Sequence, residues 1–220
     1  MSYACLVLGE SGTGKTTSLR NFDPQKTLII QPVRKPLPFR SKGWHEIKAK
    51  GDGGNIFVCH DAAKIIQCIS RAPHEVIIID DFQYILARKY MESQEPNQFT
   101  LFKQIGVDGY NICRAATELP ENKRVYVLSH TMTDENGKTK IKTLGKLLDE
   151  KITLEGLFTT VLRTKVNAGQ YLFSTHNSGS DTVKSPLGMF EQSEIDNDLN
   201  EVDKTVCEYY GINQENQETD

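Results

Sequence analysis

The sequence predicts an α/β protein with a mostly parallel sheet, flanked by helices and ending in an antiparallel edge hairpin. Short apolar runs rich in β-branched residues alternate with helical patterns, and only three residues separate the last two runs. The chain has 220 residues, 38% of them hydrophobic and 25% charged, which is typical of one globular domain. We expect one domain over residues 1–210 and a disordered acidic tail over 211–220.

Seven apolar runs are expected to form strands. They cover residues 3–8, 27–30, 55–59, 75–80, 124–129, 158–166 and 170–176. Runs that are apolar throughout are typical of strands buried on both faces of a parallel sheet. The residues between the last two runs, Asn167-Ala168-Gly169, predict a hairpin turn. Helices are predicted at 15–21, 61–71 and 98–118, the second with Asp61 as its N-cap.

Three long connections, at 31–54, 131–146 and 177–189, interrupt this alternation. Connections of this length are usually functional or disordered. The second contains the lysines Lys138, Lys140, Lys142 and Lys146. The first three alternate, so on an extended ribbon they would share one face and follow a phosphate backbone without reading sequence. The alternative is a solvated hairpin.

Charge is distributed unevenly along the chain. Lys and Arg total 26 and Asp and Glu total 29, for a net charge of −3. Residues 190–220 hold ten acidic side chains and one basic one, which leaves the first 189 residues at +6. A mildly basic body permits a polyanionic partner, with which an acidic tail would compete. The alternative is a frayed, solvated terminus.

Several classes of protein are disfavoured by the sequence. No apolar stretch approaches the length of a membrane span, and the first residues lack a basic secretion signal. The five cysteines form no CxxC pair and no cysteine–histidine cluster with zinc spacing. We therefore expect a cytoplasmic protein with reduced thiols and no membrane partner.

A glycine-rich run, GESGTGKT at residues 9–16, matches the phosphate-binding pattern GxxxxGK[ST] in full. It follows a predicted strand and opens a predicted helix, where backbone N–H groups can surround phosphates. Lys15 is expected to reach the β- and γ-phosphates, and the hydroxyl of Thr16 to bind Mg²⁺. With ATP and Mg²⁺ as cofactors, the expected nucleotide contacts are Gly9, Glu10, Ser11, Gly12, Thr13, Gly14, Lys15, Thr16 and Thr17.

A second motif consists of four aliphatic residues, 76–79, that lead into Asp80 and Asp81. A buried strand that ends in a carboxylate typically accompanies the phosphate-binding loop, and Asp80 is the expected partner of Mg²⁺. Asp81 is expected to position or activate the attacking water. The alternative for Asp81 is that it caps the following helix.

The order of these motifs resembles the RecA-type ATPase core, and more closely the small core-only RecA-like phage proteins. Some proteins of that family act as single-strand annealing recombinases. The segments that carry the resemblance are GESGTGKTTSLRNFDP (9–24), KPLPF (35–39), VIIIDDFQY (76–84), LSHT (128–131), GKLLDEKITLEGLFTTVL (145–162) and KSPLGMF (184–190). Together they place the resemblance over nearly all of the chain from residue 3 to about 210.

The resemblance implies a RecA-like P-loop ATPase domain and an activity in DNA recombination on single-stranded DNA. It also implies a homo-oligomer, either a filament or a ring, in a phage- or prophage-encoded protein of the bacterial cytoplasm. A single-strand-binding protein is a further candidate partner.

Roles for individual residues follow from the same resemblance. His130 holds the place that reads the state of the γ-phosphate and passes it to the lysine-bearing connection. Lys184 best matches the cation that a neighbouring subunit supplies to the ATP site, with Arg163 and Lys165 as weaker candidates. The expected catalytic residues are Lys15, Asp81, His130 and Lys184. The expected DNA-binding residues are Lys138, Lys140, Lys142 and Lys146.

One departure from the RecA pattern affects the expected chemistry. RecA has a glutamate just after its second strand, where this chain reads Gln31-Pro32-Val33-Arg34. Either Asp81 or Glu10 replaces that glutamate, or hydrolysis is slow, and we expect a slow, DNA-stimulated ATPase. Two other functions stay open: a nucleotide-dependent switch that recruits replication or recombination partners, and a nucleoside-type kinase. The kinase is disfavoured because the chain has no arginine-rich lid.

Overall fold

The structure is a computed structural model that describes residues 1–49, 51–145 and 151–212. Its strands are β1 (Tyr3–Gly9), β2 (Thr27–Gln31), β3 (Ile56–Val58), β4 (Val76–Ile79), β5 (Arg124–Thr133), β6 (Thr139–Ile141), β7 (Thr160–Asn167), β8 (Gln170–Ser174) and β9 (Glu194–Asp196). Its α-helices are α1 (Ala62–Arg71), α2 (Gln83–Glu92), α3 (Gln98–Thr117) and α4 (Leu199–Tyr210). Short 3₁₀ turns, η1 (Thr16–Leu19) and η3 (Leu154–Leu157), complete these elements.

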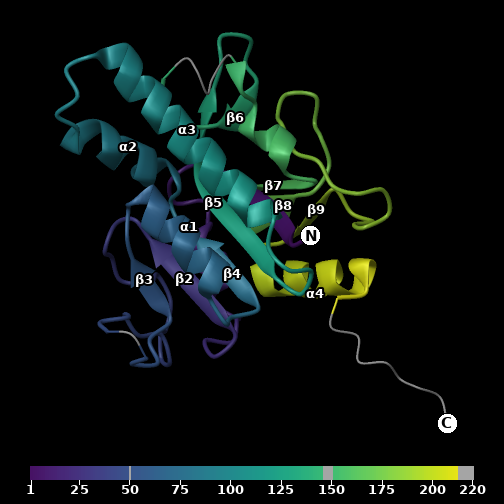
Figure 1. Ribbon diagram of the computed structural model, residues 1–220. Coiled ribbons are helices and arrows are strands. Elements are labelled where there is room, and N and C mark those ends of the chain that lie inside the picture. The colour runs from purple at the N-terminus through teal and green to yellow at the C-terminus, as the bar shows by residue number, and fades with distance from the viewer. Residues whose placement is uncertain (50, 146–150, 213–220) are drawn as a thin grey trace.

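The strands of the described residues form one mixed sheet in the order β3-β2-β4-β5-β1-β7-β8-β9, with β6 paired to β5 beside this path. The pairs from β3 to β7 along this path are parallel. The pairs β7–β8, β8–β9 and β5–β6 are antiparallel. The predicted α/β class, with a mostly parallel sheet and antiparallel edge strands, is therefore confirmed (Figure 1).

Hydrophobic cores cover both faces of the sheet, as its central strand β1 shows. Alternate residues of β1, including Leu6 and Leu8, pack into one core with side chains of α1, α2 and α3. The residues between them, including Val7, pack into a second core with η1 and α4. This double burial explains why β1 reads as an uninterrupted apolar run. None of the helices in the described ranges is long and apolar enough to cross a membrane.

Helix α4 is fixed to the sheet by a buried polar cluster. The Nε and Nη2 atoms of Arg124 donate to the two carboxylate oxygens of Asp203, each at 3.1 Å, and the hydroxyl of Tyr126 donates to Asp203 at 2.6 Å. Residues 190–210 are therefore not a solvated acidic terminus, because apolar residues at helical spacing hold α4 against the sheet. These residues are Leu199, Val202 and Val206. In the predicted tail 211–220, residues 213–220 lie outside the described part of the chain.

The predicted helices agree with the structure to different degrees. Helix α1 begins after Asp61, whose side chain accepts a hydrogen bond from the N–H of Lys64, and α3 matches its prediction closely. The helix predicted at 15–21 is wrong in length, since only the single turn η1 forms there. Its run of hydroxyl residues competes with the backbone for hydrogen bonds: the Ser18 hydroxyl donates to the carbonyl of Lys15 at 2.6 Å.

Candidate phosphate-binding site

A cavity of about 470 Å³ lies at the carboxyl ends of the central parallel strands. Its walls come from the glycine-rich loop after β1, the segment after β2, and residues that follow β4. Since β5 lies between β1 and β4, His130 on β5 is level with Gly9 and stands between the glycine-rich loop and the two aspartates. Clefts at the carboxyl ends of parallel strands are the usual ligand sites of such sheets.

Lys15 is held in place by the loop that carries it. Its side chain is buried, and its Nζ donates to the carbonyl oxygens of Gly9 at 2.9 Å and Glu10 at 2.8 Å. Burial lowers the pKa of Lys15, although the nearby carboxylates of Asp81 and Asp80 act in the opposite direction. The ammonium group therefore lies at the base of the loop, beside the cavity that it lines.

Two glycines in the loop cannot be replaced without distortion. A Cβ on Gly9 would lie 1.8 Å from the hydroxyl oxygen of Thr164, which itself contacts the hydroxyl of Thr13 at 2.6 Å. Gly14 has φ of +95°, and a Cβ there would meet side-chain atoms of Tyr171 and Asn197 at 2.9–3.0 Å. The loop is thus packed closely against Thr164, Tyr171 and Asn197, which fixes its backbone beside the cavity.

Asp80 and Thr16 form the second part of the site. The hydroxyl of Thr16 donates to both carboxylate oxygens of Asp80, at 3.0 and 3.2 Å. Asp80 is fully buried, and burial, with the charge of Asp81 adding to it, raises the pKa of Asp80 to about 6. A buried carboxylate of this kind favours a cation at its side.

The residues present fit a magnesium ion that arrives with phosphates. Mg²⁺ usually keeps several waters and takes only one or two protein ligands beside phosphate oxygens, and Thr16 and Asp80 are such a pair. Among the described residues no cluster of three or more His, Cys, Asp or Glu side chains could hold a metal by itself. The protein groups therefore suit Mg²⁺ bound together with a phosphate-bearing ligand.

Asp81 points into the cavity from an unusual backbone conformation, with φ of +61°. Its carboxylate forms an ion pair with Lys35 and lies 3.5 Å from Nε2 of His130. The alternative role of helix cap is not observed, because α2 has Phe82 at its N-cap and no side-chain capping bond. Glu10, the other candidate for a replacement carboxylate, is exposed and does not line the cavity.

Lys35 is a site residue that the sequence interpretation missed. Its Nζ pairs with Asp81 and lies 3.9 Å from Oδ2 of Asp80. It lies shortly after β2, just beyond Gln31-Pro32-Val33-Arg34, a stretch without a carboxylate. The available signal was its position between a buried strand and the prolines Pro36 and Pro38, which also line the cavity.

His130 connects the cavity to α2. Its backbone N–H donates to Oε1 of Gln83 at 3.2 Å, and its ring meets that of Tyr84 edge-on at a centroid distance of 6.4 Å. Burial, followed by the positive charge of Lys15, lowers the pKa of His130. The neutral form of the imidazole is therefore favoured, and it can donate one hydrogen bond and accept another.

The lysine-bearing connection is a β-hairpin rather than a loop. Strand β5 continues to Thr133 and β6 returns beside it, with Thr139 and Ile141 buried. Three expected DNA-binding lysines lie on β6 or next to it: Lys138 and Lys142, which are exposed, and Lys140, which is half-buried. The N–H of Lys142 donates to the carbonyl of His130 at 2.8 Å, so the hairpin starts at the cavity. Lys146 lies outside the described residues.

The cations expected to act on a neighbouring subunit lie away from the cavity in their own chain. Lys184 is half-buried and exchanges both backbone hydrogen bonds with Val161 on β7. Lys165 forms an ion pair with Glu194, and Nη1 of Arg163 lies 3.9 Å from Asp181. None of the three lysine and arginine side chains lines the cavity.

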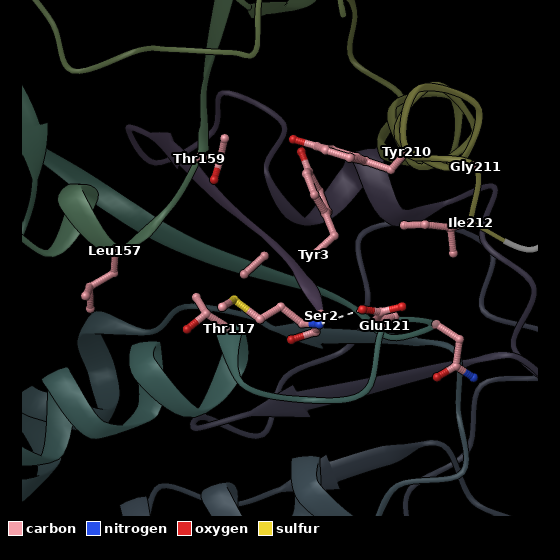
Figure 2. Close-up of a pocket in the computed structure, with 12 residues that line it drawn as sticks. Ser2, Tyr3, Thr117, Glu121, Leu157, Thr159, Tyr210, Gly211 and Ile212 are labelled. Atoms are coloured by element: carbon pink, nitrogen blue, oxygen red, sulfur yellow. Dashed lines mark hydrogen bonds and ion pairs between the residues drawn. The ribbon is translucent and has the colours of Figure 1, made fainter.

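A larger cavity, of about 710 Å³, lies at the opposite edge of the sheet. Figure 2 shows that its walls come from the start of β1, the region after α3 and the end of α4. Its ionic contact joins the amino group of Met1 to Glu121 at 3.4 Å. This cavity brings together no acid–base pair or phosphate-binding loop comparable with those around Lys15.

Comparisons with known proteins add no assignment. No protein-family model matches the chain, and a search of curated proteins finds no significant match. The function is therefore inferred from the geometry of the site and from the motifs in the sequence.

Proposed function

We propose that the protein is a RecA-like P-loop ATPase that binds ATP and Mg²⁺, hydrolyses ATP slowly, and acts on single-stranded DNA in recombination. The observation that carries the proposal is the convergence of Lys15, Thr16 and Asp80 at the carboxyl ends of β1 and β4. A rigid glycine loop, an ammonium group and a hydroxyl–carboxylate pair are the groups that a magnesium–triphosphate complex requires.

Each residue has a distinct role in this proposal. The loop N–H groups and Lys15 bind the phosphates, while Thr16 and Asp80 hold Mg²⁺. When bound, Mg²⁺ neutralises charge that develops on the transferring phosphoryl group. Asp81 orients the attacking water, and neutral His130 reports the state of the cavity to the β5–β6 hairpin. ADP and phosphate are the expected products.

The order of the strands supports the RecA-like assignment. Strand β5 separates the strand of the phosphate loop from the strand that ends at the aspartates, and its last residues leave the sheet as the lysine-bearing hairpin. A nucleotide at the cavity and a DNA backbone along Lys138 and Lys142 would thus be joined by the β5–β6 hairpin. Such a direct connection favours coupling between ATP binding in the cavity and DNA binding on the hairpin.

Partners and location are part of the same proposal. We infer a homo-oligomer on single-stranded DNA in which Lys184 of one subunit completes the ATP site of the next. A single-strand-binding protein is a further candidate partner. The sequence resemblance supports a phage- or prophage-encoded protein in the bacterial cytoplasm.

A second candidate is a nucleotide-dependent switch that recruits a replication or recombination partner without hydrolysis. The observation in its favour is that Asp81 is already engaged by Lys35 and His130. Within the described lining of the cavity no other carboxylate can activate water. In this version ATP binding itself carries the signal.

Steady-state ATP hydrolysis, titrated with single-stranded oligonucleotide, distinguishes the two candidates. The ATPase proposal predicts a low basal rate that DNA increases and that Lys15→Ala abolishes. Exposed Lys42 provides a control, since Lys42→Ala should leave the rate unchanged. Tight ATP binding with no hydrolysis at any DNA concentration would favour the switch. Hydrolysis that persists in Lys15→Ala would contradict both.

A further inference from the structure

Two neighbouring carboxylates at the cavity share one lysine. Asp80 and Asp81 are both buried, and Lys35 is the described side chain that pairs with Asp81 and also approaches Asp80 to 3.9 Å. Lys15 lies nearby but gives its hydrogen bonds to the carbonyls of Gly9 and Glu10. In this arrangement Lys35 supplies the direct ionic contact of the aspartate pair.

Bound magnesium would place a second cation in the same position. Thr16 and Asp80 are the groups that fit Mg²⁺, and Nζ of Lys35 is 3.9 Å from Oδ2 of Asp80. Mg²⁺ held at Asp80 would share this carboxylate with the ammonium group of Lys35, and two like charges close together repel strongly where solvent screening is weak. A triphosphate in the cavity, which Lys35 lines, would add negative charge near its ammonium group. Repulsion from Mg²⁺ and attraction to the phosphates therefore both favour movement of the ammonium group from the carboxylates to the phosphates.

We propose that Lys35 binds the γ-phosphate and so distinguishes a nucleoside triphosphate from a diphosphate. This inference rests on the proposed nucleotide site. In the nucleotide-free protein Lys35 pairs with Asp81 and lies beside Asp80, and on binding of the magnesium triphosphate it turns to the terminal phosphate. Lys35 thus acts within its own chain, in addition to the cation expected from a neighbouring subunit.

The segment that carries Lys35 favours a movement of the side chain rather than of the backbone. Proline at Pro36 restricts Lys35 to extended conformations, and Pro36 and Pro38 themselves have fixed φ angles. Both prolines line the cavity. The Lys35 side chain is 38% exposed, so its four-carbon stem is not enclosed by protein.

Lys35 is charged in the nucleotide-free protein. Burial alone would lower the pKa of Lys35, but the charges of Asp80 and Asp81 outweigh burial and raise it. When Lys35 turns to the phosphate it releases Asp81. The same movement therefore frees the carboxylate that is expected to orient water, but only when a terminal phosphate is present.

The test compares affinities for ADP and for a non-hydrolysable ATP analogue, both with Mg²⁺, by isothermal titration calorimetry. Lys35→Met should weaken binding of the analogue about tenfold or more, as expected for a lost charged hydrogen bond, and leave ADP binding within about threefold of wild type. Lys35→Arg should keep part of the preference for the triphosphate. Lys42→Met, from the same β2–β3 segment, is the matched control and should behave as wild type.

An unchanged ratio of the two affinities in Lys35→Met would overturn the inference. That result would leave the proposed function intact. The proposed function fails if wild type binds neither nucleotide, or if Lys15→Ala binds both normally. If Lys35→Met does not fold, the same comparison is made between Asp81→Asn and Asp81→Asn/Lys35→Met, where fewer buried charges are left unpaired. The ratio of the affinity for the ATP analogue to the affinity for ADP should be lower in Asp81→Asn/Lys35→Met than in Asp81→Asn, by the same factor.

A second readout uses Mg²⁺ without nucleotide. If Lys35 competes for Asp80, removing it should strengthen Mg²⁺ binding, and Mg²⁺ should raise the Tm of Lys35→Met more than that of wild type. An equal rise in both proteins would overturn the claim that Lys35 and Mg²⁺ compete for the carboxylates.

Discussion

Asp80 is predicted to destabilise the nucleotide-free protein at neutral pH. Burial and the neighbouring charge of Asp81 raise the pKa of Asp80 from 3.8 to about 6 in the folded state. Between these two values the folded protein holds the proton and the unfolded chain does not, so stability falls as the pH rises from about 4 to about 6. This difference between the pKa values of Asp80 in the unfolded and folded states lowers the free energy of unfolding by about 3 kcal/mol at pH 7.

The substitution Asp80→Asn imitates the protonated carboxyl group and should recover most of this loss. We expect a gain of about 3 kcal/mol at pH 7, or about 6–12 °C in Tm for a chain of this length. The gain should shrink as the pH falls and disappear near pH 4, because Asp80 is then protonated in wild type as well. The variant should also lose the stabilisation that Mg²⁺ gives to the wild type.

Urea unfolding at several values of pH between 4 and 8 measures this effect. Asp203→Asn is the control, because Asp203 is also buried but is paired with Arg124. That substitution removes the carboxylate that accepts two hydrogen bonds from the buried guanidinium of Arg124, which then keeps an ionic contact with Glu75 at 3.6 Å. It should cost about 3–5 kcal/mol. An Asp80→Asn protein less stable than wild type at pH 7, or a gain in stability that is the same at every pH, would refute a raised pKa of Asp80.

Two further predictions concern ligands. Tyr171 is half exposed and lines the cavity beside Gly14. If its ring stacks on the nucleobase, Tyr171→Ala should weaken ATP binding about tenfold, as measured by fluorescence titration. An unchanged affinity would exclude the contact. Lys138→Glu/Lys142→Glu should weaken binding to single-stranded DNA and reduce the slope of log K against log salt by about 1.4 or more, without changing ATP affinity. Lys64→Glu, at an exposed position on α1, should alter neither; equal salt slopes in all three proteins would contradict the DNA-binding role of the hairpin.

Much of the sheet could be predicted because its strands are buried on both faces. The run 76–79, four β-branched residues followed by a carboxylate, predicts an interior strand, and β4 forms there. The antiparallel edge was also predictable, since Asn167-Ala168-Gly169 forms the tight turn with Ala168 and Gly169 at positive φ. In these elements local pattern and tertiary environment agree.

Other elements could not be predicted because their sequence is ambiguous in isolation. Helix α2 has exposed Tyr84, Tyr90 and Met91, so its apolar residues do not mark one face. The acidic residues of helix α4 predict a helix that faces solvent. Asp203 is nevertheless buried, because it pairs with Arg124, which lies 79 positions away in the sequence. Strands β6 and β9 have three residues each, too few to establish a period.

The site was predictable to the extent that its chemistry lies in contiguous motifs. Lys15, Thr16 and Asp80 meet as their motifs indicate, because parallel strands bring their carboxyl ends to one edge. Lys35 belongs to no such motif. Its role depends on the pairing of β2 with β4, which places the segment after β2 beside the aspartates.

The central claim is that this cavity binds a magnesium triphosphate through Lys15. Its most direct test is the affinity of the purified protein for ATP with and without Mg²⁺, measured by calorimetry beside Lys15→Ala and the control Lys42→Ala. We expect Mg²⁺-dependent binding by wild type and Lys42→Ala, and a loss of about 100-fold or more in Lys15→Ala. Absence of binding by the wild type, or equal binding by Lys15→Ala, would contradict the account.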